Sequence, residues 1–274
     1  MRSVLSDSAH ARVEQRRRLR QMSTTELWQR LSLLASDFDT PRFELDDWEP
    51  VEDLLEALTA RETRQVVVEK FQKLDRMKSF LLQWALIGLA GSMKLYEVTR
   101  PLVELLGHDD DGLAEAASAA LGRLGSPACL SLLDARYREG SFGFRLYAIG
   151  ALQAMKLPSS ETLLRGLVDV EDDPALRGRI FDALRFHFTE AAGAMMQSEL
   201  REATSFMLPD ELEKALFVHA RVLRRKDDEA DGLRHENPGW DSGILFQIPV
   251  MEQLQSHEPC PCGRGKSYGE CCGG

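Results

Sequence analysis

The residues with the clearest chemistry are four cysteines crowded near the C-terminus of the chain. They form a C-x-C pair and a C-C pair, eight residues apart: Cys260, Cys262, Cys271 and Cys272. So short and polar a stretch cannot build a hydrophobic core, so cysteine chemistry must order it. Four thiolates suit a closed tetrahedral site for structural zinc, whereas disulfide bonds would need an oxidising compartment. Both chemistries are open at this point.

The residues between the two cysteine pairs favour metal binding. Gly263 and Gly265 allow the left-handed backbone of a tight turn, so the chain can fold around an ion. Arg264 and Lys266 partly offset the negative charge that remains when four thiolates surround one divalent zinc ion. Metal binding can supply roughly 10–16 kcal/mol to the folding of such a peptide. The pattern therefore indicates a zinc-ordered knuckle over residues 258–274.

These residues resemble the SEC-C motif, the zinc-binding tail of the SecA translocase, which also occurs as an appendage on other bacterial proteins. The chain reads C-P-C-G-R-G-K-S-Y-G-E-C-C, with the ligand positions, both glycines, the lysine and the tyrosine in register. Arg264 and Ser267 depart from the commonest filler of the motif. The resemblance covers only about residues 256–274. It implies one zinc ion per chain, bound by Cys260, Cys262, Cys271 and Cys272.

The resemblance also implies a docking role. SEC-C knuckles bind partners such as a chaperone or the ribosome and are not catalytic sites. We expect Arg264, Lys266 and Tyr268 to face outward around the metal, because they have no core to enter. Arginine and aromatic residues often dominate the energetics of protein interfaces. The alternative is a passive tail, with binding left to the rest of the chain.

Composition restricts the class of protein. A chain of 274 residues that is 43% hydrophobic can build one large domain or two smaller ones. Its net charge of −10 disfavours bulk nucleic-acid binding. The first thirty residues show no signal peptide, and the longest mainly apolar stretch, residues 80–93, is too short for a membrane span. We expect a bacterial, cytoplasmic protein in which Cys129 is a small buried side chain.

The middle of the chain contains a helical repeat. Ala-Leu pairs recur at intervals of 35, 31 and 32 residues and begin at Ala85, Ala120, Ala151 and Ala183. Helix-starting residues separate the segments, at 109–112, 125–127, 140–143, 157–158 and 172–174. Two helices per unit and a period in the thirties are typical of an α-solenoid. The stretch from residue 79 to about 200 resembles HEAT-like repeats, and a non-repeating helical bundle is the alternative.

The flanking segments complete an all-α prediction. We expect helix over 8–36, with a second start at the capping box formed by Ser23 to Glu26, and again over 51–77 after a break at 37–50. Residues 195–228 also have a helical pattern. The predicted parts are an N-terminal helical segment, the repeats, a linker and the knuckle: 1–78, 79–229, 230–257 and 258–274.

The run Arg16–Arg20 is the most basic stretch of the chain. It could form a solvated helix face, contact an acidic partner, or touch RNA together with Arg264 and Lys266. Residues 46–56 are acidic and oppose this run in sign, so an intramolecular pairing is a further possibility that the sequence alone does not establish.

No enzyme motif is present. The six histidines show no paired metal spacing. We interpret His108, which precedes Asp109–Asp111, as part of a solvated turn, and His187 as a packing or capping residue. Four protein ligands would leave zinc no position for a water nucleophile. The preferred function is a non-enzymatic adaptor that binds partners through the repeats and the knuckle. The alternative is an enzyme or modification factor with a site in the solenoid groove, as in HEAT-like bilin lyases.

Overall fold

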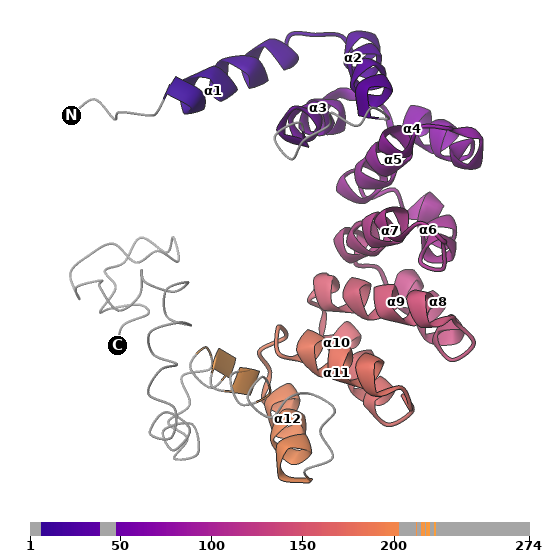
Figure 1. The fold of residues 1–274 in the computed structure, drawn as a ribbon, viewed down its shortest axis with the longest axis vertical. Coiled ribbons are helices and arrows are strands. Elements are labelled where there is room, and N and C mark those ends of the chain that lie inside the picture. Colours follow the sequence, from indigo (N-terminus) through magenta and orange to yellow (C-terminus); the bar gives the residue numbers. More distant parts are fainter. Residues whose placement is uncertain are drawn as a thin grey trace, which may run out of the picture. The chain divides into compact units, whose positions relative to one another are not determined.

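The computed structural model of the protein describes residues 7–38 and 48–202, and beyond them Leu212, Ala215, Leu216, Val218, His219 and Val222 (Figure 1). The chain divides into two compact units, Met1–Met207 and Leu208–Gly274. Every regular element among the described residues is a helix, which confirms the all-α prediction. The predicted linker and knuckle, over 230–257 and 258–274, lie outside the described residues, as does most of 203–228.

The first unit contains all of the helices that can be traced from end to end. They are α1 (Asp7–Leu19), α2 (Thr24–Phe38), α3 (Trp48–Arg61), α4 (Arg64–Phe71), α5 (Phe80–Ser92), α6 (Thr99–Leu105), α7 (Asp111–Leu124), α8 (Pro127–Tyr137), α9 (Phe142–Met155), α10 (Pro158–Val168), α11 (Pro174–Leu184) and α12 (Glu190–Glu202). Two short 3₁₀ helices, η2 (Leu74–Arg76) and η3 (Tyr96–Val98), lie between α4 and α5 and between α5 and α6.

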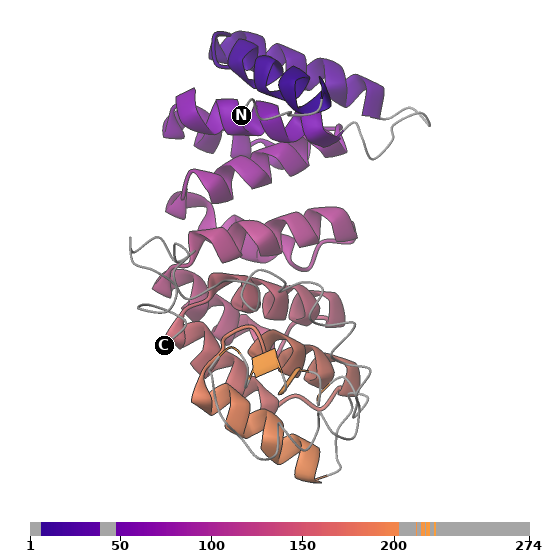
Figure 2. The same cartoon turned by 90° about the vertical axis from the view of Figure 1, so that its left-hand side faces the viewer.

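From α5 onward, successive helices alternate between two rows. The row of α5, α7, α9 and α11 is continuous, because each of these helices packs against the next (Figure 2). The second row holds α6, α8 and α10, which contact one another and also the helices of the first row (Figure 1). Each helix pair therefore buries its apolar face on the neighbouring pair.

Small residues allow the helices of the first row to approach closely. Ala85, Ala120, Ala151 and Ala183, the repeated positions predicted to pack tightly, are fully buried. A Cβ atom added to Gly91 of α5 would lie 2.7 Å from the Cα atom of Ala120 in α7. Side chains larger than alanine therefore do not fit at these contacts without moving the helices apart.

Helix starts follow the turn sequences identified in the chain. The side chains of Asp110, Ser126, Ser141 and Asp173 accept backbone hydrogen bonds and cap the first turns of α7, α8, α9 and α11. Proline is the first residue of α8, α10 and α11, where its missing N–H has no helical partner to lose. Gly125 ends α7 in the left-handed conformation, with φ of 53°.

The N-terminal segment begins a second helix where the capping box predicts one. The backbone N–H of Ser23 donates to Glu26 Oε2 at 2.7 Å, and the backbone N–H of Glu26 donates to Ser23 Oγ at 3.3 Å. This reciprocal pair separates α1 from α2, so the stretch 8–36 is two helices.

The stretch 51–77, predicted to be helical, is divided into α3, α4 and η2. The chain turns between α3 and α4, where Thr63 has an extended backbone with φ −80° and ψ 143°. Distant contacts hold the two helix ends: the Arg61 guanidinium donates to the carbonyls of Arg20 and Met22, and Arg64 Nη1 donates to the Met93 carbonyl at 2.9 Å. No glycine or proline marks this turn in the sequence.

Candidate binding groove

The residues proposed from sequence as the functional site lie outside the described part of the chain. These are the four cysteines of the predicted zinc knuckle and its three outward-facing residues: Cys260, Cys262, Cys271, Cys272, Arg264, Lys266 and Tyr268. The zinc site and its docking face therefore stay predictions. The described helices contain a separate candidate, which the sequence analysis did not identify.

Helices α3, α5 and α7 line an open groove with a volume of about 950 Å³. Its apolar wall includes Phe80 and Trp84, one helical turn apart on α5 and both half-buried. Gly88 of α5 and Ala116 and Ala119 of α7 also line it, and their small size leaves the groove open. A concave, mainly apolar surface with a few polar groups is the usual form of a binding site.

Local structure positions the aromatic wall. Ser79 caps α5 by accepting a hydrogen bond from the Leu82 N–H at 3.5 Å, so Phe80 is the first residue of the helix. The Phe80 ring lies against the backbone of Gly112, where an added Cβ atom would be 2.8 Å from the ring. Glycine at this position lets α5 and the start of α7 approach each other. The spacing of Phe80 and Trp84 was the available sequence signal, but it does not distinguish a groove wall from a core face.

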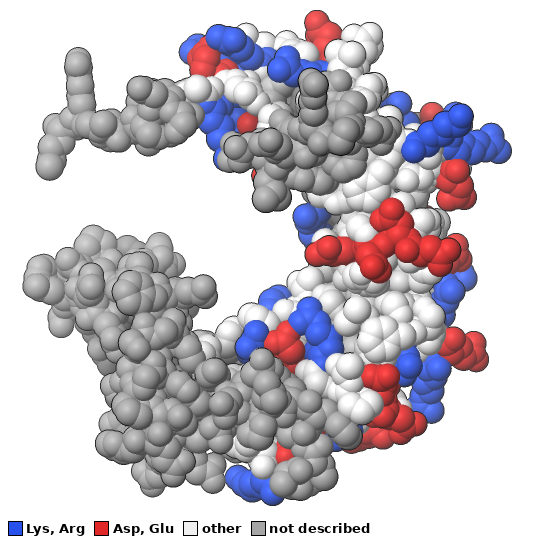
Figure 3. Space-filling view, viewed as in Figure 1, with Lys and Arg blue, Asp and Glu red and all other residues white. Residues whose placement is uncertain are grey.

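The α7 side of the groove is acidic at one end. Between Arg100 and Arg123 the chain has no lysine or arginine, and its carboxylates are all exposed: Glu104, Asp109, Asp110, Asp111 and Glu115. Figure 3 shows Asp and Glu side chains gathered in a band over α6 and α7. Of these carboxylates, Glu115 lines the groove. Arg123 also lines it, about 12 Å further along α7 at a helical rise of about 1.5 Å per residue, so the acidic end is the one near Glu115.

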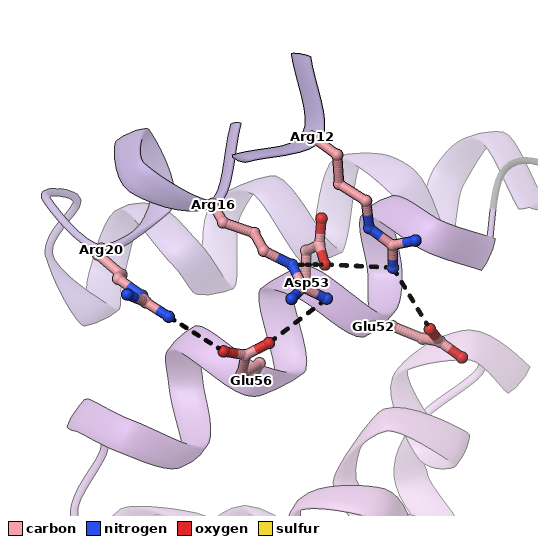
Figure 4. Close-up of polar contacts among 6 residues, drawn as sticks. All are labelled: Arg12, Arg16, Arg20, Glu52, Asp53 and Glu56. Atoms are coloured by element: carbon pink, nitrogen blue, oxygen red, sulfur yellow. Dashed lines mark hydrogen bonds and ion pairs between the residues drawn. The ribbon is translucent and has the colours of Figure 1, made fainter. Parts of the chain in front are cut away.

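The α3 side of the groove borders an ion-pair network with α1 (Figure 4). Arg16 Nε donates to Asp53 Oδ1 at 2.7 Å, and the Asp53 side chain is only 1% exposed. Arg12 lies 3.6 Å from the same Asp53 oxygen, and Arg20 lies 3.4 Å from Glu56. The structure thus confirms the intramolecular pairing of the basic run with the acidic segment, for Arg16 and Arg20.

This network uses one face of α1 and reaches the groove. Arg12 and Arg16 of α1, and Arg20 directly after its last residue, are spaced four residues apart, so they lie on the same side. Glu52 and Glu56, which line the groove, both pair with this face, at 4.0 Å from Arg12 and 3.6 Å from Arg16. Of the arginines in the run that was a candidate for RNA contact, Arg16 and Arg20 are therefore engaged with α3, whereas Arg18 pairs with Glu14 of its own helix.

The turn at His108 is a helix start. His108 Nδ1 accepts from the Asp110 N–H at 3.0 Å, Asp110 caps α7, and Asp111 accepts from the Tyr147 hydroxyl at 3.0 Å. These contacts are those of a solvated turn, as predicted. Within the described residues, no group of three or more His, Cys, Asp or Glu side chains is arranged to hold a metal ion.

Three buried ionisable side chains, those of Glu171, Tyr137 and Cys129, have packing roles. Glu171 Oε1 accepts from Arg145 Nη1 at 2.6 Å and Oε2 accepts from the Tyr137 hydroxyl at 2.7 Å, which ties the α10–α11 loop to α8 and α9. Burial and this hydrogen bond raise the pKa of Tyr137. Cys129 is fully buried, as predicted, and burial raises the pKa of its thiol to about 12.

His187 follows the end of α11 and is half-buried, in agreement with its predicted packing role. Its backbone N–H donates to the Leu184 carbonyl at 3.0 Å. Burial, and then the nearby Lys156 cation, lower the pKa of His187.

Comparison with known proteins adds no relative. No protein-family model matches the chain, and the curated proteins contain no significant match. Among the helices that the structure describes, none has both the length and the apolar composition needed to cross a membrane.

Proposed function

We propose that the protein is a non-enzymatic, zinc-binding adaptor with two binding elements, a helical-repeat scaffold and a SEC-C-like knuckle. The observation that carries this proposal is the open groove on α3, α5 and α7, whose wall combines aromatic, small and charged residues. Such a surface suits recognition of another molecule. The adaptor would act in the cytoplasm.

The scaffold half of the proposal is a HEAT-like α-solenoid. Its support is the continuous packing of α5, α7, α9 and α11, each backed by a helix of the second row. Two-helix units that contact only their neighbours create extended surfaces, because each unit adds its own exposed face to the row.

The knuckle half of the proposal is supported by the chemistry of its donor set. Cys260, Cys262, Cys271 and Cys272 provide four thiolates, the complement that a closed structural zinc site requires. Zinc would order the tail before binding, so little entropy is lost on association. Arg264, Lys266 and Tyr268 would then contact an acidic surface of a chaperone, secretion or ribosome-associated protein.

The test is affinity capture from a bacterial lysate with the full-length protein. Wild type should contain about one zinc equivalent and retain one stoichiometric protein. The variant Arg264→Ala with Lys266→Ala should keep its zinc but lose most of this partner, and the wild-type complex should weaken as salt screens the charges.

The matched control replaces two exposed basic residues of the helical unit, Lys73→Ala with Arg76→Ala. It should capture the partner as wild type does. Equal capture by both double variants would contradict a docking role for the knuckle.

A second candidate function is an enzyme or modification factor that uses the groove. The groove volume of about 950 Å³ favours it, since this is ample for a small organic molecule. A small molecule that co-purifies with wild type, in place of a protein, would support this alternative.

A further inference from the structure

The distribution of apolar and charged residues along the groove indicates what kind of molecule it binds. Its α5 wall presents Phe80 and Trp84, and small residues of α7 face them across the opening. An occupant must therefore offer apolar side chains to this part of the groove, because burying polar groups against aromatic rings without hydrogen bonds is unfavourable. The volume of about 950 Å³ accommodates several side chains at once.

Charge distinguishes the two long sides of the groove. On the α3 side, Glu52 and Glu56 are already paired with arginines of α1. On the α7 side, Glu115 is exposed and has no ion-pair partner among the described residues. The exposed carboxylates from Glu104 to Asp111 add to the negative potential at this end of α7. The available negative charge of the groove is therefore concentrated near Glu115.

Helix α1 shows how a basic helix meets the rim of this groove. Arg12 and Arg16 of α1, four residues apart, reach the carboxylates of α3, with the shortest contact 2.7 Å between Arg16 and Asp53. The mean hydropathy of α1 is low, and ion pairs connect it to α3. The α7 rim offers carboxylates of the same kind, with no corresponding basic helix among the described residues.

We propose that the groove on α3, α5 and α7 binds a basic amphipathic segment of a partner protein. Apolar side chains of this segment pack against Phe80 and Trp84, and its lysines or arginines face Glu115. Negative charge at the rim repels nucleic-acid phosphates, so a protein segment is the occupant that the charges favour. This inference rests on the proposed adaptor function, and it assigns the helical scaffold its own class of partner.

The probe is a fluorescently labelled helical peptide of leucine and lysine, with leucines on one face. Its binding to the full-length, zinc-loaded protein is measured by fluorescence anisotropy. The first variant, Ala119→Arg, places a cation and a long side chain in the groove. The matched control, Ala135→Arg, makes the same change at an exposed alanine of α8 that does not line the groove.

We expect Ala119→Arg to weaken peptide binding at least about tenfold, because like charges oppose each other in a confined site. Ala135→Arg should stay within about twofold of wild type, since screened charges at a distance have little effect. Equal binding by the two variants, or no binding of the peptide by wild type, overturns the proposal.

A conservative pair of variants tests the charge alone. Glu115→Gln removes the groove carboxylate, and Glu139→Gln removes an exposed carboxylate just after α8, outside the groove and outside the acidic stretch of α6 and α7. The first should weaken binding and reduce its salt dependence, whereas the second should do neither. Competition by poly-uridine RNA for the same site would overturn the assignment to a protein segment.

A variant of the C-terminal tail separates a failure of this inference from a failure of the proposed adaptor function. Cys271→Ser should still bind the peptide, because the groove lies wholly on α3, α5 and α7. If Ala119→Arg binds as wild type while partner capture still needs the knuckle, the groove assignment fails and the adaptor function stands.

Discussion

Single buried side chains hold neighbouring helices together in this protein. Asp53 joins α3 to α1 through Arg16, and Glu171 joins the α10–α11 loop to α8 and α9 through Tyr137 and Arg145. A buried carboxylate is unfavourable without such partners, so each fixes the position of the elements that supply them. His187 illustrates the opposite case, a group that burial keeps neutral.

The lowered pKa of His187 predicts a pH effect on stability. The unfolded chain binds a proton near pH 6.5, whereas the folded protein binds it only at lower pH. The stability contributed by the neutral ring is therefore complete above about pH 6.5 and is lost as pH falls through the folded-state pKa. Lys156 and Glu161 act on the ring in opposite directions.

The measurement is the denaturant midpoint of wild type and His187→Gln at about pH 7.5 and about pH 5.5, on either side of the unfolded pKa. The wild-type midpoint should fall more on acidification than that of the variant. Equal falls would show that His187 does not titrate differently in the folded state.

At the scale of the element, close backbone approach decides how the first row packs. Ala154 of α9 lies against Gly122 of α7 so closely that a Cβ atom on Gly122 would clash with it, and a Cβ atom on Gly150 would lie 2.9 Å from Ser118 Oγ. Both glycines lie inside helices although glycine is a poor helix former. Helix α1 differs in that ion pairs from Arg12 and Arg16 connect it to α3.

The same substitution should have opposite effects at two helical glycines. Gly122→Ala should destabilise the protein by roughly 1–3 kcal/mol, because the added methyl overpacks the α7–α9 contact. Gly166→Ala should stabilise it by about 0.5–1 kcal/mol, because α10 is exposed there and no atom lies within 4 Å of the added Cβ. Urea denaturation measures both, and a stabilising Gly122→Ala would contradict the observed packing.

At the scale of the whole molecule, two separate sources of order are proposed. The helices of the first unit bury an extensive apolar core, which contains Leu86, Leu121, Leu152 and Leu184. The C-terminal tail has no such core in its sequence and would depend on zinc.

Removal of zinc should therefore leave the helical scaffold folded. A strong chelator is expected to release about one metal equivalent and four reactive thiols per chain, as a four-thiolate site requires. The far-UV circular dichroism and the denaturant midpoint of the helices should change little. A large loss of helical signal on chelation would show that the metal also supports the scaffold.

Features that depend on neighbouring residues were predictable from the sequence. The caps at Ser126 and Asp173, the capping box at Ser23 and the burial of Ala151 and Cys129 all follow from local propensity and periodicity. These features involve residues a few positions apart, so the sequence contains the physical cause.

Features that depend on distant residues were decided only by tertiary structure. At the turn between α3 and α4, Arg61 and Arg64 donate to carbonyls about thirty to forty residues away in the chain, contacts that no local pattern predicts. The groove needs α3, α5 and α7 side by side, and its charge depends on Arg12, Arg16 and Arg20 of α1 having met α3. Periodicity identifies the apolar face of each helix, but it does not specify which faces meet or where they leave an opening.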